Sequence, residues 1–287
     1  MEFVINNIPQ RNKRKFYHLN SANRTIIGNK MSEFIQEKII EISLIDQTEN
    51  SLVFKYNLKA QKMEGSAIIH QWSSDMDNLQ ADLILVTDLE GNFIDINQFD
   101  TLQKKWKEDF LPKLKVKYAD FQPGLDVMIQ ETTKLLQNKE LFIKNFIGYS
   151  CWRFFFQSWY KKFSAEEEIP LLLTGYFGNI DLPLMLSTST TVDNNNIFIE
   201  RSARLDNENF DRKSFARMLK DLTNVYNIDA SLDIDMEERY TINNDGWLSE
   251  GELFLETSVN NWYSVSNAHQ LKELSENEYH SFIKELS

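Results

Sequence analysis

The pattern that decides the fold class is LILVTDLEGNFIDI, at residues 83–96. Two short apolar runs flank a polar turn, and Gly91 stands where a left-handed residue would close the loop. A second stretch alternates apolar and polar side chains with the period of a half-buried strand, through Leu52, Phe54, Tyr56 and Leu58. Short strands joined by tight turns predict an antiparallel sheet and not parallel βαβ winding.

After residue 97 the apolar period changes from two to about 3.6, the period of a helix. The spacing predicts a helix from 99 to 110, capped by Asn97 and ended by Pro112. Further helices are expected over 125–136 and over 138–163, the latter broken near Gly148, before strands return from residue 171. Ser275 and Glu278 form an S-x-x-E capping box, which predicts the start of a C-terminal helix.

The expected fold class is therefore α+β, with a mostly antiparallel sheet from two β-rich portions, covered by a helical middle segment and a C-terminal helix. The portions are residues 1–96, 97–168 and 169–287. Both β-rich portions run from a strand through an Asn-marked turn into an amphipathic helix. Two interpretations stay open, one continuous domain or two related halves.

Charge and glycine content restrict the classes of partner. The chain of 287 residues has 43 acidic and 31 basic side chains and a net charge of −12, so its average field repels nucleic acids and anionic membranes. It has only 9 Gly and contains neither GxGxxG nor GxxxxGK[ST], the loops that cradle nucleotide phosphates. We expect no nucleic-acid partner and no cofactor.

Cysteine use and hydropathy bear on the cellular compartment. Cys151 is the single cysteine, which is typical of a reducing compartment because no internal disulfide can form. The first residues lack the apolar run of a signal peptide, and no stretch reaches the 18 apolar residues of a membrane span. The expectation is a cytoplasmic protein without a membrane span.

One acidic segment alternates carboxylates with apolar residues. Asp229, Asp233, Asp235 and Glu237 are interleaved with Ala230, Leu232, Ile234 and Met236. On a strand the four carboxylates share one face. That face is either an ordinary solvated surface or a docking surface for a basic protein partner.

An aromatic segment follows the middle of the chain. On the expected helix, Trp152, Phe155, Phe156 and Trp159 share one broad face. This pattern predicts a central core helix, and an alternative interpretation is an aromatic-lined site for a small apolar ligand.

The segment Gly148–Phe154, with the order Gly-Tyr-Ser-Cys-Trp-Arg-Phe, resembles the segment around the nucleophile of papain-like cysteine proteases. The resemblance implies Cys151 as nucleophile, with His269 or His280 downstream. This chain departs from the family at Asn145, where the family has its oxyanion-hole Gln. The interpretation we favour is an inert cysteine in the core.

No catalytic residue and no metal ligand is expected, because the four histidines are far apart and no nucleophile elbow occurs. The function expected is that of a non-enzymatic interaction protein, such as an adaptor, an immunity or inhibitor protein or an assembly accessory, with an acidic surface. The alternatives are a carrier or sensor of an apolar small molecule and, third, an enzyme of unknown class.

Overall fold

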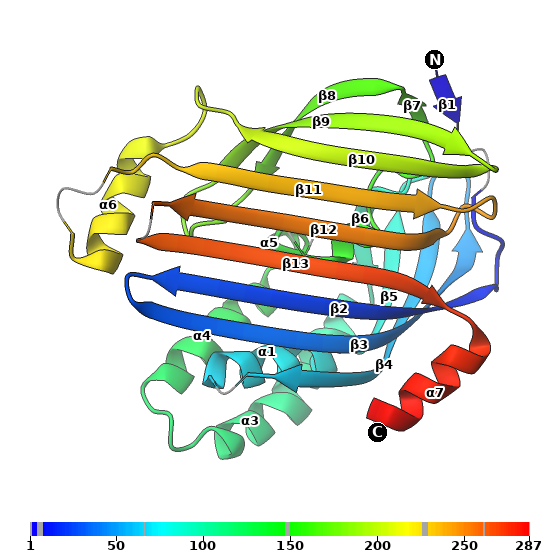
Figure 1. The fold of residues 1–287 in the computed structure, drawn as a ribbon. Helices are drawn as coiled ribbons and strands as arrows, with labels where there is room; N and C mark the ends of the chain where they lie inside the picture. The colour runs from blue at the N-terminus through cyan, green and yellow to red at the C-terminus, as the bar shows by residue number, and fades with distance from the viewer. Residues whose placement is uncertain are drawn as a thin grey trace.

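The computed structural model describes residues 2–4, 8–65, 67–146, 150–225, 229–260 and 262–286. Within these ranges eleven strands form one sheet in which neighbouring strands run antiparallel (Figure 1). Strands of both β-rich portions lie in this sheet, and β2 pairs with β13 where the portions meet. The predicted antiparallel sheet is confirmed. Its strands follow the order β6 (Phe93–Asn97), β5 (Asp82–Thr87), β4 (Leu52–Glu64), β3 (Lys30–Gln47), β2 (Arg14–Ile27), β13 (Tyr263–Leu274), β12 (Leu248–Val259), β11 (Asp233–Ile242), β10 (Asn196–Leu205), β9 (Leu182–Asp193) and β8 (Glu166–Leu173).

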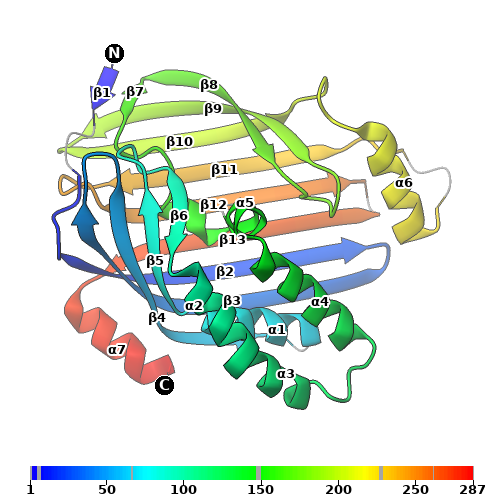
Figure 2. The same cartoon turned by 180° about the vertical axis from the view of Figure 1, so that it is seen from behind.

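Most helices cover one face of the sheet, which we call the inner face (Figure 2). The larger apolar core lies there, and it contains Trp72, Leu102 and Trp106 of the helices together with Tyr17 and Leu19 of the sheet. A smaller core at the far ends of the same strands holds helix α6. The helices and short elements are α1 (Ile68–Leu79), α2 (Phe99–Lys105), η1 (Trp106–Phe110), α3 (Leu111–Lys117), α4 (Gly124–Gln137), α5 (Lys139–Phe146), η2 (Cys151–Phe154), α6 (Arg212–Thr223) and α7 (Glu276–Leu286), and a small separate ribbon pairs β1 (Glu2–Val4) with β7 (Lys162–Ser164).

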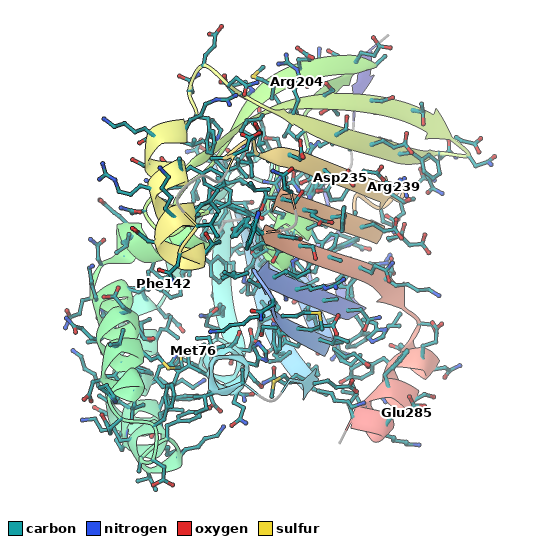
Figure 3. All side chains as sticks on the ribbon, turned by 60° about the vertical axis from the view of Figure 1, so that its left-hand side comes forward. Met76, Phe142, Arg204, Asp235, Arg239 and Glu285 are labelled. Carbon is teal, nitrogen blue, oxygen red and sulfur yellow. The ribbon has the colours of Figure 1, made fainter. Side chains whose placement is uncertain are left out.

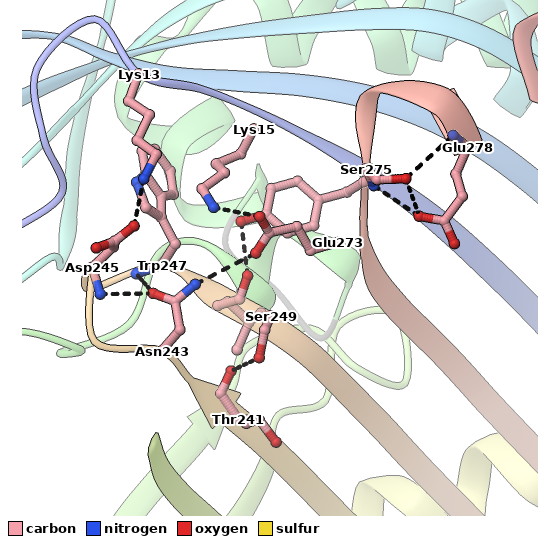
Figure 4. A network of polar contacts seen from close by, with 12 residues as sticks. Lys13, Lys15, Thr241, Asn243, Asp245, Trp247, Ser249, Glu273, Ser275 and Glu278 are labelled. Atoms are coloured by element: carbon pink, nitrogen blue, oxygen red, sulfur yellow. Dashed lines mark hydrogen bonds and ion pairs between the residues drawn. The ribbon is translucent and has the colours of Figure 1, made fainter. Parts of the chain in front are cut away.

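Helix α7 lies on the opposite, outer face and starts where the sequence predicts. The backbone N–H of Ser275 donates to Glu278 Oε2 at 2.8 Å, and the N–H of Glu278 donates to Ser275 Oγ at 3.3 Å. Figure 4 shows this capping box beside the ion pair of Lys15 and Glu273, which joins the start of β2 to the end of β13. The capping box is therefore confirmed, because both reciprocal hydrogen bonds are made.

Two predictions about helices are wrong. Pro112 does not end a helix, since the helical turns continue through η1 and α3 to residue 117, with Pro112 at the second position of α3, directly after the π-helical turn η1. The residue before α2 is Gln98, with φ of 62°, and Asn97 belongs to β6.

Of the segment 138–163, which is expected to be helical with a break near Gly148, only the first part is an α-helix. Helix α5 ends at Phe146, and η2 is a single 3₁₀ turn followed by turns and β7. Gly148 and Tyr149 lie outside the described residues. A helix has one face toward the sheet, whereas this segment sends its rings to several elements: Trp152 to Tyr56 of β4, Phe154 toward Gly251 of β12.

Candidate interaction surface

Strand β11 separates two kinds of side chain. Asp233, Asp235, Glu237 and Arg239 are exposed on the outer face, while the residues between them point to the inner face. Figure 3 shows Asp235 and Arg239 on the side of the sheet away from Met76 and Phe142, which belong to the helices of the inner face. The outer face of β11 is therefore the acidic one.

Asp229 does not lie on this face of the strand. It precedes β11, which begins at Asp233, and its carboxylate accepts hydrogen bonds from the backbone N–H and the hydroxyl of Ser231 at 3.1 and 2.8 Å. The predicted row of four carboxylates is therefore wrong in that member, because an aspartate that accepts from the residue two positions on forms a turn and ends the extended alternation.

The acidic surface extends over the neighbouring strands. Tight antiparallel pairing places their alternate residues on the same outer face. Outward side chains on β8, β10, β11 and β12 comprise nine carboxylates and two guanidinium groups: Glu166, Glu168, Glu200, Asp233, Asp235, Glu237, Glu250, Glu252 and Glu256, with Arg204 and Arg239. One end of the sheet thus has a large excess of negative charge.

Arg239 stands at the centre of these carboxylates. Its guanidinium group lies 2.8 Å from Glu237, 3.4 Å from Glu252 and 4.0 Å from Glu200. All four side chains are more than half exposed, so each pair is weak on its own. One cation among three carboxylates leaves an attraction for further positive charge.

The outer face is hollowed around Arg239. Three adjoining hollows of about 680, 490 and 440 Å³ lie over β8–β11, over β10–β13 with β2, and over β11–β13 with β2 and β3. Arg239 lines all three, and we call them together the outer groove. The charged residues of its lining that point outward are Glu166, Glu168, Glu200, Glu237, Glu250, Glu252, Arg239 and Lys272.

The inner face has a buried ion-pair cluster that sequence reasoning missed. Arg153 of η2 donates to Glu238 Oε1 from Nε at 3.1 Å and from Nη2 at 2.9 Å, and Arg201 Nη1 lies 3.4 Å from Oε2. The hydroxyl of Tyr240 donates to the same carboxylate at 2.8 Å. This cluster fastens η2 to β10 and β11, and the two buried guanidinium groups share the single carboxylate of Glu238, so each buried cation has an opposite charge beside it.

A histidine lies in the same register row of the inner face. His269 Nδ1 is 2.8 Å from Ser21 Oγ across the β13–β2 pair. Burial, with a smaller contribution from the positive charge of Lys38, lowers the pKa of His269 from its usual 6.5 to about 4. Among the described residues no carboxylate forms a hydrogen bond with this ring, so the pair lacks the orienting acid of a nucleophile triad.

The aromatic residues of the expected ligand site are packed against other rings. Trp152 lies 4.6 Å from Tyr56 between ring centroids, and Trp159 lies 4.6 Å from Tyr240. The small crevice beside Phe155 and Trp159 has a volume of about 20 Å³. That is room for about one water molecule, so the structure has no space for an apolar ligand there.

Cys151 is surrounded by the core and not by catalytic partners. Burial raises the pKa of its thiol, which is the opposite of what a thiolate nucleophile requires. His280 lies exposed on α7, on the outer face, while Cys151 packs with the inner core. The geometry fits the structural interpretation of this cysteine.

Two kinds of feature are absent from the described ranges. They contain no group of three or more His, Cys, Asp or Glu side chains arranged to hold a metal ion. Nor does any helix in them have the length and apolar character needed to cross a bilayer.

Sequence reasoning missed most of the outer groove. Glu200, Arg239 and Glu252 come from three strands, and each strand has the same signal, a polar residue at every second position. The alternation could have been read in each strand. Which polar residues become neighbours depends on strand register, which no single strand reveals.

Comparisons with known proteins add no functional information. No family model matches the chain, and no curated protein matches it. Among solved structures, one described as Salmonella typhi OmpF in complex with daunomycin matches with 8% identity over 96% of this chain and 100% of that chain. The TM-score is 0.22, too low for a statement about fold or function.

Proposed function

We propose that this protein is a non-enzymatic interaction protein that binds a basic protein partner in the outer groove. The observation that carries the proposal is the combination of an uncovered sheet face, three adjoining hollows and an excess of carboxylates around Arg239. Adaptor, immunity and assembly roles all fit such a surface, and the lone Cys151 supports a reducing compartment, the cytoplasm.

The charge distribution sets the kind of partner. Carboxylates on the rim of a binding surface attract a basic partner over a distance and orient it during encounter. Binding should therefore be weakened by salt, because exposed charges are screened beyond a Debye length of about 8 Å at physiological ionic strength.

The test uses two double variants with the same net charge. Glu237→Gln with Glu252→Gln neutralises two carboxylates beside Arg239, while Glu108→Gln with Glu131→Gln neutralises two exposed carboxylates on the helical side of the molecule. Each variant serves as bait for affinity purification from the native host, followed by native mass spectrometry and measurement of Kd for the captured protein.

We expect a basic protein to be captured by the wild type and by the helical-side control. The groove variant should bind it about fivefold more weakly, the equivalent of roughly 1 kcal/mol for two exposed pairs. Equal binding by all three proteins, or capture of an acidic partner alone, would refute the proposal.

A further inference from the structure

A row of apolar side chains crosses the floor of the outer groove. Phe254, Ala268, Ala22 and Ile35 are consecutive register partners on β12, β13, β2 and β3, so they form one line across four strands. Ile35 is 38% exposed, and Ala22 is also exposed. Because two of the four are alanines, the line is a depression, and the hollow of about 440 Å³ lies over it.

The dimensions of this apolar row suit an α-helix. Four strands at about 4.8 Å spacing give a row about 14 Å long. Polar residues border it on both sides, with Glu252 and Glu256 four residues apart on β12, or about 13 Å along the strand. A helix with its side chains is about 10 Å wide, so it fits between these polar borders. The row's length of about 14 Å corresponds to about nine helical residues.

The same face already holds one amphipathic helix of this chain. Phe16 and Leu274 point outward as register partners on β2 and β13, and both are buried under α7. Tyr279 of α7 stacks on Phe16 with ring centroids 4.0 Å apart, and Phe282 stacks on His18 at 4.4 Å. Outward apolar residues on these strands therefore already pack against one helix. Helix α7 covers only the residues at one end of the strands (Figure 1).

The charges around the apolar row indicate which side chains such a helix should carry beside its apolar stripe. Glu237, Glu252 and Glu256 surround its β12 end, with Arg239 as the cation among them and Arg24 nearer the β3 end. A helix with an apolar stripe at i, i+3, i+4 and i+7 and with Lys or Arg beside that stripe complements both the floor and the rim.

We infer that the outer groove binds an amphipathic, basic α-helix of the partner protein, laid across β12, β13, β2 and β3 over the apolar row. The inference rests on the proposed function and adds to it the conformation and the apolar stripe of the bound segment. In this binding mode the alanines matter as much as the carboxylates, since a larger side chain on the floor would lift the helix from the sheet.

The test uses two synthetic fluorescein-labelled peptides of 16 residues and identical composition. One places Leu at helical spacing with Lys beside the stripe, and the other places the same Leu residues so that no apolar stripe forms on a helix. Anisotropy measures their Kd for the wild type and for Ala268→Phe, which fills the hollow. Ala119→Phe, an exposed position on the helical side, is the matched control.

The expected result is that the striped peptide binds at least about tenfold more tightly than its isomer and gains helical circular dichroism on binding. Ala268→Phe should lower its affinity about tenfold, and Ala119→Phe should leave it unchanged. Suppose that both peptides bind equally well and that the Glu237→Gln, Glu252→Gln variant loses this binding. The inference that the bound segment is an amphipathic helix is then wrong, and the proposed function still stands.

Three further outcomes would refute the inference or the proposed function. If the striped peptide does not bind, or binds with no effect of Ala268→Phe, the helix-binding groove is wrong. If neutralising Glu237 and Glu252 also leaves capture of the native partner unchanged, the proposed function fails with it. Sedimentation showing a wild-type dimer that Ala268→Phe abolishes would identify a second copy of this chain as the occupant and overturn the inference.

Discussion

Replacement of His269 should remove a large part of the acid sensitivity of this protein. The imidazole is buried on the inner face, with its Nδ1 2.8 Å from the hydroxyl of Ser21 on β2 and with Lys38 of β3 as the charged neighbour. Burial, and then the charge of Lys38, lowers its pKa to about 4. His269→Gln keeps a polar side chain toward Ser21 and cannot titrate.

The sign and size of the effect follow from linkage. The folded protein holds His269 neutral down to about pH 4, whereas the unfolded chain takes up the proton near pH 6.5. The contribution of neutral His269 to the free energy of unfolding is therefore complete above about pH 6.5, and it is lost as the pH falls toward 4. A pKa difference of 2.5 units at 1.36 kcal/mol per unit corresponds to about 3 kcal/mol.

The assay is urea unfolding followed by tryptophan fluorescence at intervals between pH 7.5 and 4. Across this range the wild type should lose about 3 kcal/mol more of its free energy of unfolding than His269→Gln. Subtracting the two curves removes the contribution of the carboxylates, which both proteins share. His280→Gln, on the exposed surface of α7, is the control and should follow the wild type. Parallel curves for the wild type and His269→Gln would show that the reasoning about burial is wrong.

Two other substitutions test the packing of the inner face. Glu238→Gln leaves two buried guanidinium groups without their carboxylate, so it should lower the free energy of unfolding by about 3–5 kcal/mol. The control is Glu237→Gln at the exposed neighbouring residue, which should lower it by less than about 1 kcal/mol in the same urea titration. Gly251→Ala places a Cβ 2.6 Å from the ring of Phe154 and should lower the free energy of unfolding by about 1–3 kcal/mol. Adding Phe154→Leu should restore part of that loss. If the losses of the two single variants simply add in the double variant, the clash is wrong.

Local patterns account for the parts of the fold that were predicted. The 83–96 hairpin is present as β5 and β6, with Gly91 at a φ of 94°, because turn geometry and alternation are set by neighbouring residues. The helical spacing of its rings predicts a helix for the aromatic segment. Its rings instead fill gaps between separate elements, and tertiary packing outweighs a weak local preference for helix.

The sequence by itself determined three properties: the alternation of apolar and polar side chains in each strand, the capping box of α7 and the excess of negative charge. These properties depend on residues within a few positions of one another. Tertiary structure alone decided that Ala22 and Ala268, from opposite ends of the chain, lie side by side in the outer groove, and that Glu252 lies beside Arg239. The reason is that strand register sets which outward side chains become neighbours, and register is fixed by the burial of all the inner side chains together.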